Sequence, residues 1–327
     1  MEKILTVAIP TYNRAKYLDL LLSGLLSQVE DLRGWVDIVI SDNCSTDGTR
    51  EVVRRYSDAG LSLRYLRNQQ NMGATWNTIR CFEEAQTKYV LVFGDDDILL
   101  DGTFKKLAQL LSNDDYGAVY LKSYSYLGDH MAERPANAES GTRIYDDPRL
   151  FFRQVNFWIT FLSGIIVNKR ALPGDFSPRQ FESTSVPQLA WVIPAALSSK
   201  KNACVLDFCV AAKQANTGGY QLCSVFGASM NAIFDKLVAL GAPKACFDEV
   251  NSKLLTDFFP INILLARKGA NFKDENYFES LAPIFSGDIK FWVFVVPVIR
   301  LPLSAAAFWR RGMNFVLRGL RKIGVNI

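Results

Sequence analysis

The sequence predicts an α/β protein in which a mostly parallel, Rossmann-like sheet is flanked by helices and followed by a helical C-terminal extension. Two observations favour this fold. Short apolar segments alternate with helical patterns through residues 4–93, and residues 220–286 show successive helical patterns. Alternation of this kind implies βαβ units, whose strands run parallel and whose helices cover both faces of the sheet.

The apolar pattern predicts each element in turn. Strands are predicted at 4–9, 36–40, 61–66 and 89–93, with helices between them at about 16–28, 46–57 and 75–85. Further strands are predicted at 116–127 and 164–167, and a helix at 186–197. The polar stretch 128–142 predicts a mobile loop that covers a bound ligand. It contains His130, the only histidine of the chain, so a multi-histidine metal centre is excluded.

A polar cluster follows each of the first four strands. The clusters are residues 10–14, 41–48, 68–73 and 94–97. The carboxyl ends of parallel strands meet at one edge of a sheet, where the ligands of open α/β sheets bind. We therefore expect all four clusters to lie along that edge.

The fourth cluster contains three consecutive acids, Asp95, Asp96 and Asp97, directly after an apolar strand. Adjacent carboxylates repel one another unless a cation joins them. Mg²⁺ and Mn²⁺ take oxygen ligands and are commonly completed by substrate phosphates, so this pattern predicts a metal-diphosphate site. A solvated acidic turn is the alternative.

Together the four motifs resemble those of GT-A glycosyltransferases of family 2. The resemblance covers residues 4–101 and rests on Pro-Thr-Tyr-Asn-Arg, Ser-Asp-Asn-x-Ser-Thr-Asp-Gly, Asn-x-Gly followed by Asn77, and Gly-Asp-Asp-Asp-Ile-Leu. The last motif resembles bacterial sugar transferases of the abequosyltransferase type. The resemblance implies a GT-A fold and a nucleotide-sugar donor.

The resemblance also implies roles for individual residues. The residues matched to donor binding are Pro10, Thr11, Tyr12, Asn13, Arg14, Asp42, Asn71, Gly73, Asn77 and Asp95. Asp42 would accept a hydrogen bond from the nucleotide base. Alternatively, Asp42 is an acidic residue that caps the turn, although Asp47 is the better candidate for that role. Arg14 would reach a phosphate or, alternatively, be a solvated arginine at a helix start.

Within the acidic motif, Asp96 matches the ligand of a divalent metal, Mn²⁺ or Mg²⁺. Asp95 would lie near the ribose or the metal, and Asp97 would be a support or second ligand. The usual family pattern Asp-x-Asp-Asp would place an acid at Gly94, so this chain departs from the family there.

Sugar transfer also requires a base that removes the acceptor hydroxyl's proton. In this family a downstream carboxylate supplies it, and Glu182 is the candidate here, although its match to the family's Glu-Asp pair is incomplete. Asp175 is the second candidate. A surface acid at a helix start is the alternative for Glu182.

Composition and charge describe the rest of the chain. The six cysteines show no Cys-x-x-Cys pair and no signal peptide is visible, so we expect reduced thiols and a cytoplasmic active site.

The predicted domains are a catalytic domain at 1–215, with a nucleotide-sugar half at 1–101 and an acceptor half at 102–215, then a helical region at 216–288 and a basic tail at 289–327.

The tail carries seven bases and no acids. The whole chain is +4, so residues 1–288 sum to −3. From Trp309 onward, Trp309, Met313, Val316, Leu317, Leu320 and Ile323 recur at helical spacing, with the arginines on the other side. Such a helix suits an anionic membrane surface, and packing on the body or on a second copy of the chain is the alternative. No nucleic-acid module is evident.

The sequence thus predicts a peripheral enzyme of the inner membrane face. It would move a sugar from a nucleotide-diphosphate donor to a lipid-linked oligosaccharide in bacterial surface polysaccharide synthesis, such as that of O-antigen. Two alternatives remain: an inactive nucleotide-sugar-binding scaffold, and a nucleotidyltransferase. The second lacks support, because residues 10–14 contain no glycine-rich basic triphosphate loop.

Overall fold

The computed structural model describes residues 3–137, 139–214, 219–270 and 272–322. The chain forms two compact units. The first comprises Met1–Phe151 and Trp158–Asn216, and the second comprises Phe152–Phe157 and Thr217–Ile327.

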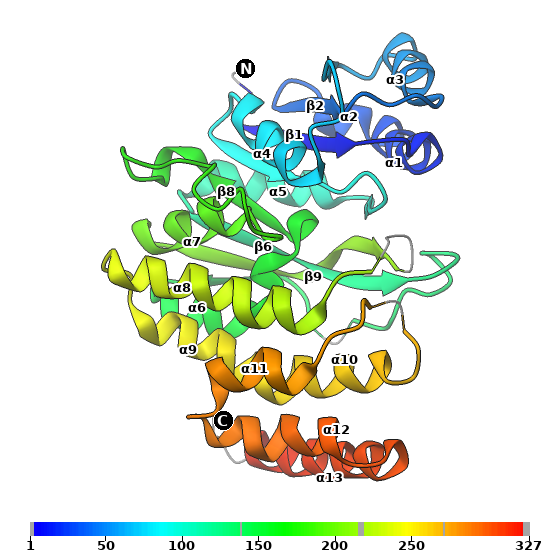
Figure 1. Ribbon diagram of the computed structural model, residues 1–327. Helices are drawn as coiled ribbons and strands as arrows, with labels where there is room; N and C mark the ends of the chain where they lie inside the picture. Colours follow the sequence, from blue (N-terminus) through cyan, green and yellow to red (C-terminus); the bar gives the residue numbers. More distant parts are fainter. Residues whose placement is uncertain (1–2, 138, 215–218, 271, 323–327) are drawn as a thin grey trace. The chain divides into compact units, whose positions relative to one another are not determined.

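The first unit contains one nine-stranded sheet (Figure 1). Its strands are β1 (Leu5–Thr11), β2 (Val36–Asp42), β3 (Leu63–Arg67), β4 (Tyr89–Val92), β5 (Ile98–Leu99), β6 (Ala118–Tyr126), β7 (Thr142–Tyr145), β8 (Ile165–Asn168) and β9 (Asn202–Lys213). Their order is β3-β2-β1-β4-β8-β6-β9-β5, and β7 also pairs with β9. The predicted strands all form, whereas the sequence does not predict β5, β7 or β9.

The sheet is parallel where the polar clusters were expected and mixed elsewhere. β3, β2, β1 and β4 pair in parallel, with Leu5 opposite Val36 on one side and Tyr89 on the other. β8 is antiparallel to both β4 and β6, and β9 is parallel to β6. The predicted βαβ alternation is therefore confirmed for the first four strands. Beyond them the sheet is mixed, because β8 runs antiparallel to both of its neighbours.

Helices cover both faces of this sheet, as predicted. The helices of the unit are α1 (Ala15–Ser27), α2 (Val29–Leu32), α3 (Thr49–Asp58), α4 (Ala74–Glu84), α5 (Thr103–Asn113) and α7 (Leu189–Ser198), and α6 (Pro148–Val155) links the two units. Leu5 of β1 shares one core with Leu18 of α1 and Phe104 of α5. On the opposite face, Phe82 of α4 stacks on Trp191 of α7 at 4.5 Å. Because both faces are covered, β1 and β2 are buried along nearly their whole length, as central parallel strands usually are.

The second unit is helical. It contains α8 (Met230–Ala239), α9 (Lys244–Lys253), α10 (Phe259–Ala266), α11 (Tyr277–Phe285), α12 (Val296–Arg300) and α13 (Leu303–Lys322), with π-helical turns at Ser224–Ser229, Leu254–Phe258 and Phe291–Val295. Its helices are interrupted at Gly241 and Gly269, whose φ angles of 97° and 90° lie in the left-handed region that glycine adopts readily. Among the described residues, no helix combines the length and apolarity needed to cross a bilayer.

The last helix, α13, differs from the sequence expectation in its orientation. Leu317, predicted on the free apolar side, is 2% exposed and packs into the unit with Ala306. Phe308 and Phe315 instead point outward and are 79% and 81% exposed. The helix has apolar residues on two sides, and the side that carries Ala306 and Leu317 is the one that packs. Ile323, the end of the predicted stripe, lies outside the described residues.

Candidate functional site

The four polar clusters meet at the carboxyl edge of β1 to β4, as predicted. The Thr11 hydroxyl donates to Asp95 Oδ2 at 2.7 Å. The backbone N–H of Asn43 donates to the carbonyl of Thr11 at 2.9 Å, and that of Asn68 donates to the carbonyl of Asp42 at 2.8 Å. The ends of four strands that are up to 84 residues apart in the chain are thus joined at one edge.

Arg14 bridges two of the three consecutive acids. Its Nη1 atom lies 2.9 Å from Asp95 Oδ1 and 2.6 Å from Asp96 Oδ2. Asp95 is 4% exposed, whereas Asp96 is only partly buried. Burial raises the pKa of Asp95 to about 6 despite the opposing charge of Arg14. Two carboxylates therefore converge on one positive group at the edge of the sheet.

Asp97 is held by the protein itself. The Ser163 hydroxyl donates to its Oδ2 at 2.5 Å, and the backbone N–H of Lys213 donates to its Oδ1 at 3.0 Å. Burial, followed by repulsion from Asp96, raises the pKa of Asp97 to about 7. Because both of its oxygens accept hydrogen bonds from distant segments, Asp97 anchors the acidic turn to the sheet.

Gly94 shows why the chain departs from the family pattern at this position. A Cβ atom there would lie 3.0 Å from Asp96 Oδ1, 3.2 Å from Asp97 Oδ2 and 3.3 Å from Ser163 Oγ. The backbone N–H of Gly94 also donates to Ser163 Oγ at 2.8 Å. Any side chain at residue 94 would therefore crowd the hydrogen bonds that hold Asp97.

Asp42 lies at the end of β2 and is 1% exposed. Its Oδ1 accepts from the backbone N–H of Ser45 at 2.8 Å, and its Oδ2 accepts from the Tyr65 hydroxyl and lies 3.5 Å from Arg67 Nε. Burial, followed by the hydrogen bond to Asp42, raises the pKa of Tyr65 to about 12. A carboxylate has about four acceptor positions, so Oδ1 retains one position that these groups do not use.

The loop between Asn71 and Gly73 is fixed by amide side chains. Asn71 Oδ1 accepts from Asn43 Nδ2 at 2.7 Å and from the N–H of Gly73 at 2.9 Å. Gly73 has a φ of 89°, which a residue with a side chain rarely adopts. Asn77 is buried, and its amide bonds both the hydroxyl and the carbonyl of Ser41. The backbone N–H of Asn77 also donates to the carbonyl of Gly73 at 3.2 Å, so Asn77 connects the loop to the end of β2.

The first loop is fastened to the second. Asn13 has a φ of 53°, its backbone N–H donates to Ser45 Oγ at 2.9 Å, and its Oδ1 accepts from the N–H of Thr46 at 2.8 Å. These bonds leave the Tyr12 side chain exposed and Pro10 partly buried at the rim of the site. An exposed tyrosine ring beside Asp42's loop offers a surface on which a planar base can stack.

Glu182 is placed on a turn before α7, and its side chain is 38% exposed. Its carboxylate pairs with Arg179 at 3.1 Å, and Arg179 also pairs with Glu83 of α4 at 2.7 Å. The described contacts thus link Glu182 to α4. Asp175 is exposed on the preceding turn.

The acidic turn fits a divalent cation. No three acidic, histidine or cysteine side chains within the described residues form a complete metal site. Asp95 and Asp96 nevertheless converge on the Arg14 guanidinium, which shows that a positive group is accommodated between them. Two carboxylates completed by substrate oxygens match the ligand preference of Mg²⁺ and Mn²⁺.

Several residues of the site carry no signal in the sequence. Ser163, Lys213, Tyr65 and Arg67 each touch an acid of the site, yet none lies in a recognisable motif. Ser163 and Lys213 are 66 and 116 residues from Asp97 in the chain, so only the fold brings them together.

Comparison with known proteins identifies relatives among sugar transferases. The model of the family described as glycosyl transferase family 2 matches residues 6–172, just over half of the chain. The abequosyltransferase RfbV of Salmonella typhimurium is 28% identical over 199 residues, which cover 57% of this chain and 59% of that protein. The GalNAc(5)-diNAcBac-PP-undecaprenol beta-1,3-glucosyltransferase of Campylobacter jejuni is 26% identical over 178 residues, 51% of this chain and 54% of that protein. The chain thus spans less than two thirds of either relative.

Solved structures confirm the predicted fold class. S. aureus TarS 1-349 in complex with UDP matches with a TM-score of 0.62 at 18% identity, covering 98% of this chain and 92% of that one. The Pyrobaculum calidifontis mannosyltransferase in complex with GDP-Man and Mn²⁺ matches with a TM-score of 0.52 at 16% identity, covering 95% and 87%. At such identities the likeness concerns the fold.

Proposed function

Because this chain belongs to glycosyl transferase family 2, we propose that it transfers a sugar from a nucleoside-diphosphate donor to a hydroxyl of a lipid-linked glycan. The observation that carries the proposal is the meeting of four strand ends at one sheet edge, where Thr11 and Arg14 contact the carboxylates of Asp95 and Asp96. A nucleoside diphosphate needs polar partners for the base and a cationic partner for the diphosphate, and we assign these roles to Asp42 and to Arg14 with a bound metal.

In this proposal the base lies against Tyr12 and donates a hydrogen bond to Asp42. The loop of Asn71 and Gly73 closes the other side of the pocket. Arg14 would pair with a donor phosphate, and Asp95 and Asp96 would hold the metal. Asp96 would be the main ligand, because it is the least buried of the three acids, and Asp97 would support the turn through its bond to Ser163. When bound, the metal would act as a Lewis acid on the diphosphate.

The acceptor hydroxyl must lose its proton during the attack, and Glu182 is proposed as the base. In the donor-free structure its carboxylate pairs with Arg179. Apo geometry is often looser than that of the substrate complex, so a shift of Arg179 toward Glu83 alone would release Glu182 for the acceptor.

The acceptor is proposed to be a glycan on a lipid carrier in bacterial surface polysaccharide synthesis. The Campylobacter jejuni relative is named for an undecaprenol-linked glycan, and the Salmonella relative is named as an abequosyltransferase. On α13, Phe308 and Phe315 point outward with Arg311 and Arg318 beside them on the same exposed side. Aromatic rings flanked by arginines suit the interface of an anionic membrane, at the inner face of the cell membrane.

The Arg179–Glu182 ion pair also favours a second candidate function. If Glu182 stays paired when substrates bind, the protein would bind a nucleotide-sugar without transferring it. Such a scaffold would bind the donor and be insensitive to Glu182→Gln, whereas a transferase with this base would lose turnover.

Calorimetric titration with UDP, CDP, GDP and dTDP, each with and without Mn²⁺, tests the proposal. We expect one diphosphate to bind tightly and only with Mn²⁺. Asp96→Ala should weaken that binding at least about 100-fold, because charge-assisted contacts to a metal-bound diphosphate contribute several kcal/mol. Asp101→Ala, an exposed acid after the same turn, is the control. Equal binding by the Asp96→Ala variant would place the donor site elsewhere.

A further inference from the structure

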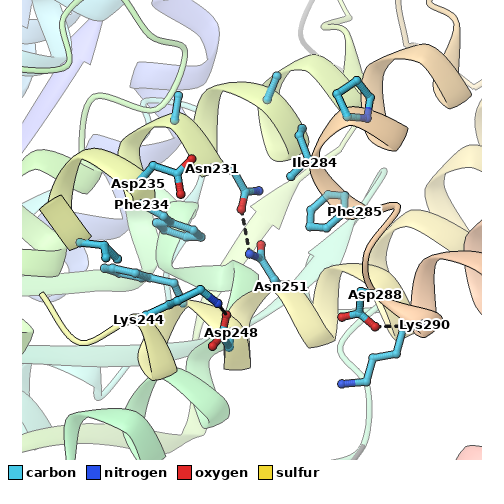
Figure 2. Close-up of a pocket in the computed structure, with 15 residues that line it drawn as sticks. Asn231, Phe234, Asp235, Lys244, Asp248, Asn251, Ile284, Phe285, Asp288 and Lys290 are labelled. Carbon is cyan, nitrogen blue, oxygen red and sulfur yellow. Dashed lines mark hydrogen bonds and ion pairs between the residues drawn. The ribbon is translucent and has the colours of Figure 1, made fainter.

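The helical unit contains an open cavity of about 750 Å³ that the donor site does not use. It lies between α8, α9 and the segment from α11 to Lys290 (Figure 2). Its volume falls in the range of small-molecule sites, roughly 300–1,000 Å³. Every lining residue belongs to the second unit, so the cavity is complete without any strand-edge residue.

Two amides from different helices meet at this cavity. Asn251 Nδ2 of α9 donates to Asn231 Oδ1 of α8 at 2.8 Å, and Asn231 Nδ2 donates to the carbonyl of Gly227 at 2.9 Å. Figure 2 shows these side chains facing each other, with Ile284 and Phe285 nearby. Asn251 Oδ1 is buried and has no hydrogen-bond partner among the described residues. The cavity wall therefore holds a fixed acceptor that an N–H or O–H donor would satisfy.

The charged lining residues argue against an ionic ligand. Three acids and two lysines line the cavity, which gives it a net charge of −1. Lys244 pairs with Asp248 at 2.6 Å, and Lys290 Nζ donates to Ser252 Oγ at 3.0 Å. An anion would therefore meet excess negative charge and engaged lysines. A cation would find no point at which three acids of the described residues converge.

The lining also includes apolar surface. Ala232, Val238 and Ile284 line the cavity beside the amides. Phe234 and Phe247 also line it, and their rings stack with centroids 4.4 Å apart. A purely apolar ligand would bury the polar groups of Asn251 and Asp235 without partners, which costs free energy. The lining therefore matches a neutral ligand that combines hydroxyl groups with C–H faces.

We propose that this cavity binds a neutral saccharide, which is the class of ligand with that combination. Saccharide hydroxyls donate to Asn251 Oδ1 and to the free acceptor positions of Asp235, and the ring C–H groups pack on the aliphatic lining. In this protein the saccharide is a unit of the acceptor glycan, and this assignment rests on the proposed function. The helical unit would then select the acceptor while the sheet unit binds the donor.

Saturation-transfer-difference NMR of the full chain tests the proposal. The probes are methyl glycosides of glucose, galactose, mannose and N-acetylglucosamine, measured with an excess of nucleoside diphosphate and diamagnetic Mg²⁺ that occupies the donor site. We expect a saturation-transfer signal for at least one glycoside. Ala232→Trp, which places an indole inside the cavity, should abolish it. Asn251→Ala should weaken it about tenfold, the loss expected from about one hydrogen bond.

The matched control is Ala239→Trp, which changes an exposed alanine of the same helix outside the cavity lining. Signals retained by this variant and lost in Ala232→Trp support the site. Equal signals from both variants, or no transfer to wild-type protein, would overturn it even if a nucleotide binds. A different outcome separates the two proposals. If the protein binds no nucleotide but gives a glycoside saturation-transfer signal that Ala232→Trp abolishes, the saccharide site stands and the transferase function is refuted.

Discussion

Asp95, Asp96 and Asp97 are adjacent in the chain, yet each carboxylate has different partners. Asp95 accepts from Thr11 and pairs with Arg14, and Asp97 accepts from Ser163 and the backbone of Lys213. Both of these acids are buried, so each costs free energy in its charged form unless the partners remain. Asp96 is the acid with access to a ligand. The chain thus uses two acids to position the third.

Arg14 should compete with a metal ion for the carboxylates that it bridges. Arg14→Ala removes this cation, so we expect the free energy of unfolding to fall by about 1–3 kcal/mol, less than for a fully buried pair because Arg14 is partly exposed. Mn²⁺ alone should then restore more stability to the variant than to the wild type, because it binds only the folded state. Thermal unfolding with and without Mn²⁺ measures both effects. Arg54→Ala, at an exposed arginine of α3, is the control, and equal Mn²⁺ responses in all three proteins would contradict the competition.

Gly94 is the second residue whose replacement separates the proposed roles. A Cβ at this position would lie 3.0 Å from Asp96 Oδ1, so Gly94→Ala should destabilise the fold by about 1–3 kcal/mol and weaken Mn²⁺-dependent nucleotide binding. Gly24→Ala is the matched control, because nothing lies within 4 Å of its Cβ and α1 should gain about 0.5–1 kcal/mol from the better helix former. Denaturant unfolding and titration give the two readouts. A Gly94→Ala protein that binds nucleotide normally would show that the acidic turn tolerates displacement.

At the scale of elements, the strand ends could be predicted because both signals are local. Apolar period and βαβ alternation fix the parallel order, and parallel order fixes the edge at which Thr11, Asp42 and Asp95 meet. The supports of these residues could not be predicted in the same way. Ser163 and Lys213 reach Asp97 through η2 (Leu162–Gly164) and β9, and the pairing of β9 with β6 depends on contacts between distant segments. The antiparallel half of the sheet was missed for the same reason.

Asp47 joins two elements and gives a pH dependence that can be measured. Its carboxylate accepts from the backbone of Ala15 in α1 and from the N–H and hydroxyl of Thr49 in α3. Burial opposes ionisation, but these hydrogen bonds outweigh it and lower the pKa of Asp47 below its ordinary value of 3.8. Because the folded-state pKa is the lower one, the stabilisation is present above pH 3.8 and is lost as pH falls through the folded-state pKa.

We therefore expect Asp47→Ala to cost about 0.5–1 kcal/mol near pH 7, at the low end for a capping residue because the carboxylate is exposed. The difference from wild type should shrink below pH 4. Urea unfolding at a series of pH values measures it, with Asp58→Ala at the other end of α3 as the control. A difference that is constant with pH would show that Asp47 acts through its shape alone.

At the scale of the whole molecule, charge and exposed apolar surface are unevenly distributed. Residues 1–288 sum to −3, and the seven bases after Asp288 reverse the sign. The sequence predicted a basic amphipathic tail, but it could not predict which side of α13 packs, because the helix has apolar residues on both sides. The structure also shows that removing residues 289–327 would be a poor test of membrane binding. Phe291, Val295 and Val298 are buried in the second unit, so their loss would damage its core.

Substitutions on the outward side of α13 give the sharper test. Phe308→Ser with Phe315→Ser removes the two exposed rings and keeps the packing side that carries Ala306 and Leu317. Burial of a phenylalanine side chain contributes about 1.5–3 kcal/mol, so partial insertion of two rings predicts at least a tenfold weaker affinity for vesicles with anionic lipid. Leu240→Ser is the control, because Leu240 is a similarly exposed residue at the end of α8.

Sedimentation with phosphatidylglycerol-containing vesicles measures the affinity, and neutral phosphatidylcholine vesicles separate the charge contribution. Wild-type binding should weaken as salt rises, because each Lys or Arg near an anionic surface contributes about 1 kcal/mol that salt screens. If the double variant binds as tightly as wild type and Leu240→Ser, the exposed rings do not enter the membrane. In that case a second copy of the chain is the remaining occupant of this side, and the oligomeric state of wild type should then differ from that of the double variant.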